Sequence, residues 1–144
     1  DKYDIPFTMS VITDNIGKPG TITWEQAKEM KNSGLVTIAS HSQNHVEFNK
    51  ISTDDAIKNV NKSYEEIEKN LSNSETKIFT YPYGLYTEEE IEKLKTLGYV
   101  QNLTDNKINK SKDLDLSRLH RCYPLSDSTP KIVLKMMYRS IRYN

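Results

Sequence analysis

Two of the three histidines in the chain, His41 and His45, lie four residues apart and directly follow the apolar run 35–39. Neutral imidazole is a ligand for zinc, cobalt and nickel, and this spacing lets two rings reach one ion if the segment makes a helical turn. The run predicts a strand, and α/β folds gather ligands at the carboxyl ends of their strands. The pattern is compatible with a divalent-metal site for zinc, cobalt, nickel or iron. Two polar loop histidines without a metal are the other interpretation.

A second candidate group, Tyr81-Pro82-Tyr83-Gly84, closes the apolar run 77–81. Its aromatic rings could lie against a sugar or a peptide, and the backbone N–H of Tyr83 could donate a hydrogen bond to an oxyanion. The alternative is a tight turn in which Pro82 and Gly84 fix the backbone and the tyrosines pack inside. The residues alone favour the turn and leave both interpretations open.

Basic residues mark the last strand-like segment, where Arg118, His120 and Arg121 occur close together. Alternation along a strand would place Arg118 and His120 on one face and Arg121 on the other. A buried arginine needs a carboxylate partner, so an inward Arg118 would suit an active-site acid, whereas all three side chains could equally be solvated. The single cysteine, Cys122, is interpreted as a small core residue rather than a nucleophile.

Strand-like and helix-like segments alternate along the chain and must position these groups. Short apolar runs predict strands, and hydroxyl N-caps followed by apolar stripes predict helices. Strand–helix–strand units in succession predict a parallel sheet, and therefore an α/β fold that is either doubly wound or part of a (β/α) barrel. The predicted strands are 7–13, 35–39, 77–81, 99–104 and 116–123, and the predicted helices begin at Thr23, Ser52, Thr87 and Ser128.

Composition narrows the range of functions. The 144 residues include 20 basic and 20 acidic side chains, and the resulting net charge of zero disfavours a nucleic-acid-binding protein. No run approaches the roughly 18 apolar residues that a membrane span needs. Residues 1–4 lack the charged and apolar regions of a signal peptide. The length predicts a single domain over residues 1–144.

The motifs together resemble a known family. The order of the segments ITWEQAKEMKNSGLVTIASHSQNH, FTYPYG and EEEIEKLKTLGY is similar to that of the polysaccharide deacetylases of the NodB-homology type, carbohydrate esterase family four. The similarity runs from about Ile5 to Tyr99 and weakly on to Arg118. The His-Ser-x-x-His motif followed one βα unit later by Tyr-Pro-Tyr-Gly is a strong joint signal, although each part is weak alone.

This resemblance implies a partial or distorted (β/α) barrel of mainly parallel strands. It implies a metal-dependent hydrolase that removes N-acetyl groups from cell-surface or cell-wall polysaccharides, and an extracellular or surface location. By position, His41 and His45 match the two metal-binding histidines of the family, whose metal is usually Zn²⁺, with Co²⁺ or Ni²⁺ as alternatives. Pro82 and Tyr83 match its third motif, whose tyrosine N–H binds the oxyanion, and Tyr81, Pro82 and Tyr83 would contact the substrate.

The sequence also departs from the family pattern. Thr80 stands where many members carry an arginine. This departure resembles the branch of the poly-N-acetylglucosamine deacetylases, and Arg118 is expected to take the role of that arginine. The family's Thr-Phe-Asp-Asp-Gly motif, which supplies the base and a third metal ligand, has no match before Phe7. A leucine-x-histidine motif is not clearly present either, since Leu119-His120 does not fit its usual setting.

Three further expectations follow from these departures. The first βα unit is missing, the chain alone is inactive, and an edge left exposed permits a homodimer. The alternative function is a catalytically inactive, deacetylase-like module that binds glycan or has a structural role.

Overall fold

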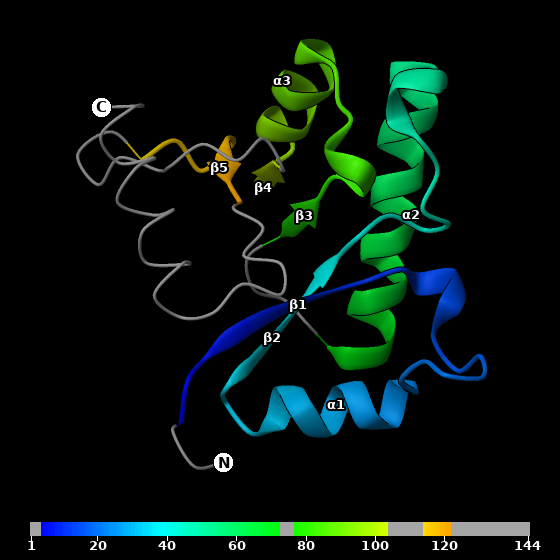
Figure 1. Ribbon diagram of the computed structural model, residues 1–144, viewed down its shortest axis with the longest axis vertical. Coiled ribbons are helices and arrows are strands. Elements are labelled where there is room, and N and C mark those ends of the chain that lie inside the picture. Colours follow the sequence, from blue (N-terminus) through cyan, green and yellow to red (C-terminus); the bar gives the residue numbers. More distant parts are fainter. Residues whose placement is uncertain (1–3, 73–76, 104–113, 122–144) are drawn as a thin grey trace, which may run out of the picture.

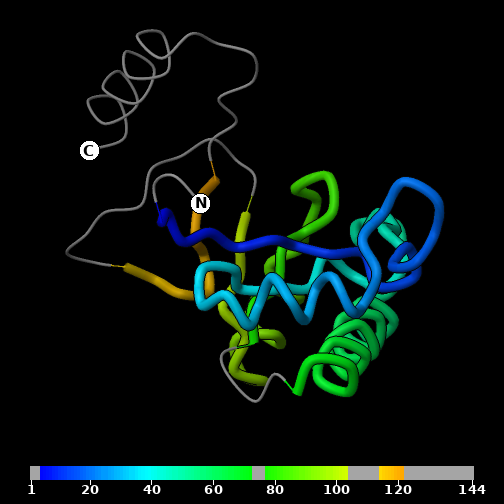
Figure 2. Tube along the Cα trace, turned by 90° about the horizontal axis from the view of Figure 1, so that it is seen from below, coloured from blue at the N-terminus to red at the C-terminus, as the bar shows by residue number. Residues whose placement is uncertain are grey.

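The computed structural model describes residues 4–72, 77–103 and 114–121. Their five strands form one sheet in which every neighbouring pair is parallel and the spatial order follows the chain, β1-β2-β3-β4-β5 (Figure 1). The strand direction turns strongly between β1 and β4, as expected of a twisted sheet (Figure 2). The strands are β1 Phe7–Val11, β2 Val36–Ser40, β3 Ile78–Thr80, β4 Val100–Leu103 and β5 Leu119–His120.

Three α-helices connect the strands: α1 Trp24–Asn32, α2 Thr53–Leu71 and α3 Glu88–Thr96. Helix α2 contacts both α1 and α3, and the three helices lie side by side along one face of the sheet (Figure 1). A doubly wound sheet reverses its strand order and carries helices on both faces, whereas a (β/α) barrel keeps sequential order with an outer layer of helices. The described elements therefore form an α/β fold of the barrel type, and this part of the prediction is confirmed.

Local sequence explains where these helices begin and end. Thr23 with Gln26, and Thr87 with Glu90, form capping boxes at the starts of α1 and α3, as the sequence predicts. Ser52 accepts a hydrogen bond from the backbone N–H of Asp55 at the start of α2. Helix α3 is followed by Gly98 with φ of +80°, a left-handed conformation that glycine adopts without strain.

Helix α2 is central to the core because its apolar stripe faces the sheet. The spacing in the sequence predicts this stripe, and all five of its members are buried: Ala56, Val60, Tyr64, Ile67 and Leu71. The N-terminal part of the stripe, up to Tyr64, packs with Phe79 of β3 and Leu103 of β4. The C-terminal part, Ile67 and Leu71, packs with Val11 of β1 and Ile38 of β2.

Four predicted strands are longer than the observed ones, and for two of them a turn explains the difference. Strand β1 ends at Val11 because residues Thr13–Asn15 form a 3-10 turn. Strand β5 begins only at Leu119 because Asp115 Oδ1 accepts hydrogen bonds from the N–H and the hydroxyl of Ser117, which makes a turn there. Cys122 and the helix predicted from Ser128 lie outside the described residues. None of the helices in the described ranges is long and apolar enough to cross a membrane.

Candidate metal and oxyanion site

His41 follows β2 directly, and its ring is oriented by the neighbouring strand β3. The Nδ1 atom lies 2.7 Å from the carbonyl oxygen of Thr80, the last residue of β3. Because a carbonyl oxygen only accepts hydrogen bonds, Nδ1 carries the proton and the Nε2 lone pair is available to a ligand. The backbone N–H of His41 donates to the Val11 carbonyl at 2.8 Å, so three strands fix this residue.

The surroundings of His41 keep its imidazole neutral. Burial is the main cause that lowers the pKa of His41, and the nearby charges of His45 and Arg121 lower it further. The hydrogen bond to Thr80 acts in the opposite direction and does not outweigh them. A neutral imidazole is the form that binds a metal ion.

The structure brings His41 and His45 together. Their Nε2 atoms lie 3.2 Å apart, and their ring centroids are separated by 4.8 Å at an interplanar angle of 65°. Two ligand atoms roughly 2.0–2.1 Å from one tetrahedral ion lie about 3.3–3.4 Å apart, so the observed separation fits a shared zinc ion. Within the described residues, however, no third histidine, cysteine or carboxylate joins the pair.

The loop between the two histidines is held in an unusual backbone conformation. Ser42 has φ of +69° and His45 has φ of +60°, and Tyr83 on the adjacent loop has φ of +56°. Left-handed conformations of such residues cost on the order of 1–3 kcal/mol each and gather at functional sites. Hydrogen bonds oppose this cost, since the hydroxyl of Ser42 accepts from the His45 N–H at 2.8 Å. Ser40, bonded to Ser63 of α2, accepts from the Ser42 N–H.

Tyr83 lies beside the histidine pair. Its ring centroid is 4.4 Å from that of His45, and 62% of the residue is exposed. The turn Pro82–Gly84 is closed by the N–H groups of Gly84 and Leu85, which donate to the carbonyls of Tyr81 and Pro82. Among the hydrogen bonds found in the described residues, none uses the N–H of Tyr83. That N–H is therefore not consumed by the sheet.

Tyr81 and Pro82 lie in the core, contrary to the expectation that they contact a substrate. Tyr81 is 0% exposed, and its ring packs on Phe79. Its hydroxyl donates to Gln101 Oε1 at 2.7 Å, and burial raises the pKa of Tyr81. Pro82 is also fully buried. Neither ring has a surface with which to contact a glycan, so Tyr83 is the exposed ring of this turn.

Arg118 is engaged on helix α3. Its guanidinium lies 2.6 Å from a carboxylate oxygen of Glu88 and 3.2 Å from one of Glu92. These acids hold the side chain on the outer helix, so the expected role of Arg118 beside a catalytic acid does not fit its position. The reason is the acidic start of α3, which attracts the cation.

Arg121 is the arginine whose charge acts on His41, and the sequence-based reasoning assigned it to the opposite face. Strand β5 has two residues only, and the N–H of Arg121 donates to the carbonyl of Leu103 at 2.8 Å. Arg121 therefore follows a strand end, as His41 does. Because α/β folds gather ligands at the carboxyl ends of their strands, the place of Arg121 after β5 in the sequence is a signal for a residue near the site.

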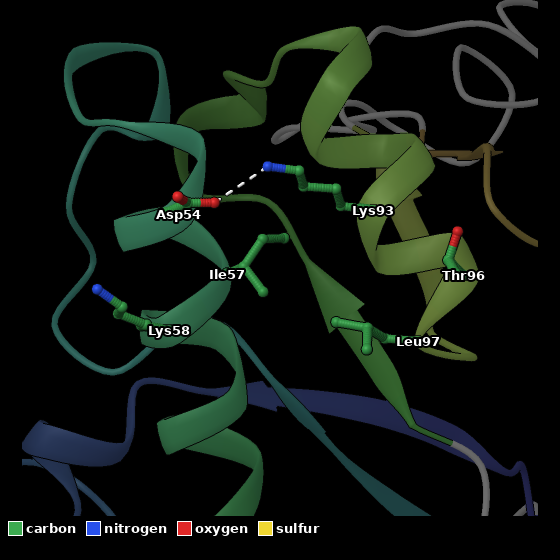
Figure 3. A pocket seen from close by; sticks show the side chains of 6 residues that line it. All are labelled: Asp54, Ile57, Lys58, Lys93, Thr96 and Leu97. Carbon is green, nitrogen blue, oxygen red and sulfur yellow. Dashed lines mark hydrogen bonds and ion pairs between the residues drawn. The ribbon is translucent and has the colours of Figure 1, made fainter.

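A pocket elsewhere on the surface lies between α2 and α3 (Figure 3). Its lining contains no histidine, and Lys93 pairs there with Asp54 at 3.0 Å. It consists of side chains on the outer helices, so it is separate from the histidine pair.

The family model and the most similar curated proteins all point to one family. The sequence model of the polysaccharide deacetylase family matches residues 1–101. YxkH of Bacillus subtilis (strain 168), which its name groups with the polysaccharide deacetylases, is 31% identical over 120 residues, covering 83% of this chain and 42% of YxkH. A poly-beta-1,6-N-acetyl-D-glucosamine N-deacetylase of Staphylococcus epidermidis is 28% identical, covering 92% of this chain and 50% of that protein. The chain thus spans about half the length of these relatives or less.

Solved structures share the fold. The Streptococcus pyogenes deacetylase PplD, solved in complex with acetate, superposes with a TM-score of 0.83 at 27% identity, covering 94% of this chain and 60% of PplD. IcaB from Ammonifex degensii gives a TM-score of 0.77 at 23% identity, covering 93% of this chain and 63% of that one. A family-four pseudoenzyme, BA3943 of Bacillus anthracis, gives 0.62 at 15% identity, with 98% of this chain and 53% of BA3943 covered.

Proposed function

Because the chain belongs to the polysaccharide deacetylase family, we propose that it contributes to a metal-dependent hydrolase acting on the N-acetyl groups of an N-acetylglucosamine polysaccharide. One observation carries the proposal: the Nε2 atoms of His41 and His45 lie 3.2 Å apart, while His41 Nδ1 is bonded to a carbonyl. Of the metals considered, Zn²⁺ fits a pair of imidazoles best, and Co²⁺ or Ni²⁺ could replace it.

His41 and His45 would hold the metal, which when bound acts as a Lewis acid and lowers the pKa of a water molecule. The Thr80 carbonyl keeps the proton of His41 on Nδ1, and Arg121 disfavours a second proton on that ring. The N–H of Tyr83 would donate to the oxygen that becomes negative when the amide is attacked, a contribution of roughly 3–4 kcal/mol for such a donor. The exposed Tyr83 ring would support the sugar.

A third metal ligand and a general base are still required. Catalytic zinc takes three protein ligands, and the described residues supply two. We propose that the missing ligand and the base lie outside the described residues; the chain itself covers half or less of these relatives' length. The substrate and an extracellular or cell-surface location are likewise inferred from the Staphylococcus epidermidis relative.

A second candidate function is a deacetylase-like module that binds glycan without cleaving it. The observation that favours it is the pair of imidazoles without a third ligand in the described residues, together with a pseudoenzyme among the structural neighbours. The exposed Tyr83 ring would then serve binding alone.

The test compares amine release from N-acetylglucosamine oligomers by residues 1–144 and by the chain extended upstream, each with added zinc, cobalt or nickel. The metal-dependent hydrolase predicts turnover by the extended protein and its loss when His41 is changed to alanine. Loss of a base alone costs about 10²–10⁴-fold in rate, so residues 1–144 should be slower by at least that factor. Glycan binding by the extended protein without amine release under any of these metals would favour the binding module.

A further inference from the structure

A short loop separates the two histidines, and Asn59 of helix α2 makes hydrogen bonds to it. Asn59 Oδ1 accepts a hydrogen bond from the backbone N–H of Gln43 at 2.8 Å. Asn59 Nδ2 donates to the side-chain oxygen of Asn44 at 2.9 Å. The half-buried side chain of Asn59 therefore bonds to two of the three residues between the histidines, Gln43 and Asn44.

The opposite side of the loop is held by the segment that follows β1. The N–H of Asp14 donates to the Gln43 carbonyl at 2.9 Å, and Gln43 Nε2 donates to Asp14 Oδ1 at 3.1 Å. Gln43 is thus fixed between Asn59 and Asp14. The position of His45, two residues later, depends on the path of this loop, because His41 itself is already fixed by β1 and β3.

The loop needs such support because its backbone is strained. Ser42 and His45 are both left-handed, with φ of +69° and +60°. Without the bond from Gln43 to Asn59, the segment between them could relax toward ordinary backbone angles. Relaxation would move the His45 ring away from His41, because β1 and β3 hold His41 in place while His45 follows the path of the loop.

From these contacts we propose that Asn59 is a positioning residue for the metal pair: it sets the loop path that brings His45 Nε2 to His41 Nε2. This inference rests on the proposed metal site. The side chain of Asn59 bonds to Gln43 and Asn44 rather than to either imidazole, and it acts through these two residues. Helix α2 thereby contributes to the site as well as to the core.

The test uses residues 1–144 with Zn²⁺ as the probe, and it follows the imidazole nitrogens in ¹⁵N NMR spectra. In the wild-type chain, zinc is expected to shift Nε2 of His41 and His45 with a common midpoint. In Asn59→Leu, the midpoint should rise by roughly 10-fold or more, the effect typical of losing a residue that orients metal ligands, and the two histidines should no longer respond together.

Asn61→Leu is the matched control. Asn61 lies on the same helix, is also half-buried, and accepts one hydrogen bond from the Tyr99 hydroxyl at 2.9 Å, away from the loop. Asn61→Leu should lose as much stability as Asn59→Leu but keep the zinc midpoint of the wild-type chain. Asn59→Asp retains an acceptor for the Gln43 N–H, so amide exchange of Gln43 should stay slow in this variant and become fast in Asn59→Leu.

Three results would overturn the inference, and they differ in what they say of the metal site. A zinc midpoint within twofold of wild type in Asn59→Leu, or an equal loss in Asn61→Leu, contradicts the positioning role and leaves the metal site intact. No response of either imidazole in the wild-type chain contradicts the metal site, and the inference falls with it.

Discussion

At the scale of single residues, hydrogen-bond partners decide which side chains are available for chemistry. His41 and Tyr81 both lie near the end of β3, yet one presents an available ring nitrogen and the other is enclosed. The difference arises because His41 bonds to the Thr80 carbonyl through Nδ1 and faces His45 through Nε2, whereas the one hydroxyl of Tyr81 is used by Gln101. Burial and bonding, not residue type, separate the site from the core.

Replacing Tyr81 with phenylalanine should reduce stability without changing glycan binding. The substitution leaves Gln101 Oε1 buried without its donor, and an unsatisfied buried acceptor costs about 1–3 kcal/mol. The measurement is the free energy of unfolding in urea. Tyr83→Phe is the control and should stay within about 0.5 kcal/mol of wild type because the residue is exposed. Equal stability of Tyr81→Phe and wild type would contradict the assignment of Tyr81 to the core.

At the scale of elements, the sequence predicted most of what local rules control. The hydroxyl N-caps and the buried stripe of α2 were predicted because each depends on residues within one helix. The roles of Arg118 and Arg121 were not, because they depend on which residues of α3 and β2 face the end of β5. Asn59 was also missed, since its partners lie 15 and 16 residues away in the sequence.

The turn before β5 should respond to acid. Hydrogen bonds from the hydroxyl and the N–H of Ser117 lower the pKa of Asp115 below its usual value of 3.8. A lowered carboxyl pKa stabilises the folded turn above pH 3.8, and this contribution is lost as the pH falls through the folded-state pKa. The Ser117 amide resonance should therefore titrate below pH 3.8. In Asp115→Asn this titration should disappear, and a persistent transition would assign it to another group.

At the scale of the whole molecule, the described sheet is open. Within the described residues, strand β1 pairs only with β2, and Phe7 and Ile5 beside it are 51% and 65% exposed. An unpaired parallel edge with apolar side chains can accept another strand.

Residues 1–144 should consequently self-associate through β1. Phe7→Lys places a charge at the edge and should shift the population toward monomer in sedimentation velocity at matched concentrations. Leu97→Lys is the control, because Leu97 is also exposed, at 43%, but follows helix α3. A monomeric wild-type chain, or an equal effect of both substitutions, would contradict association through this edge.

The most direct test of the account is to locate the metal. Crystals of the chain soaked in zinc should show one anomalous-scattering peak at the zinc absorption edge, roughly 2.0–2.1 Å from Nε2 of both His41 and His45. The peak should vanish in the double variant His41→Ala, His45→Ala. A peak bound by only one of these histidines, or zinc bound elsewhere with none at this pair, would contradict the central claim that the two imidazoles form a shared metal site.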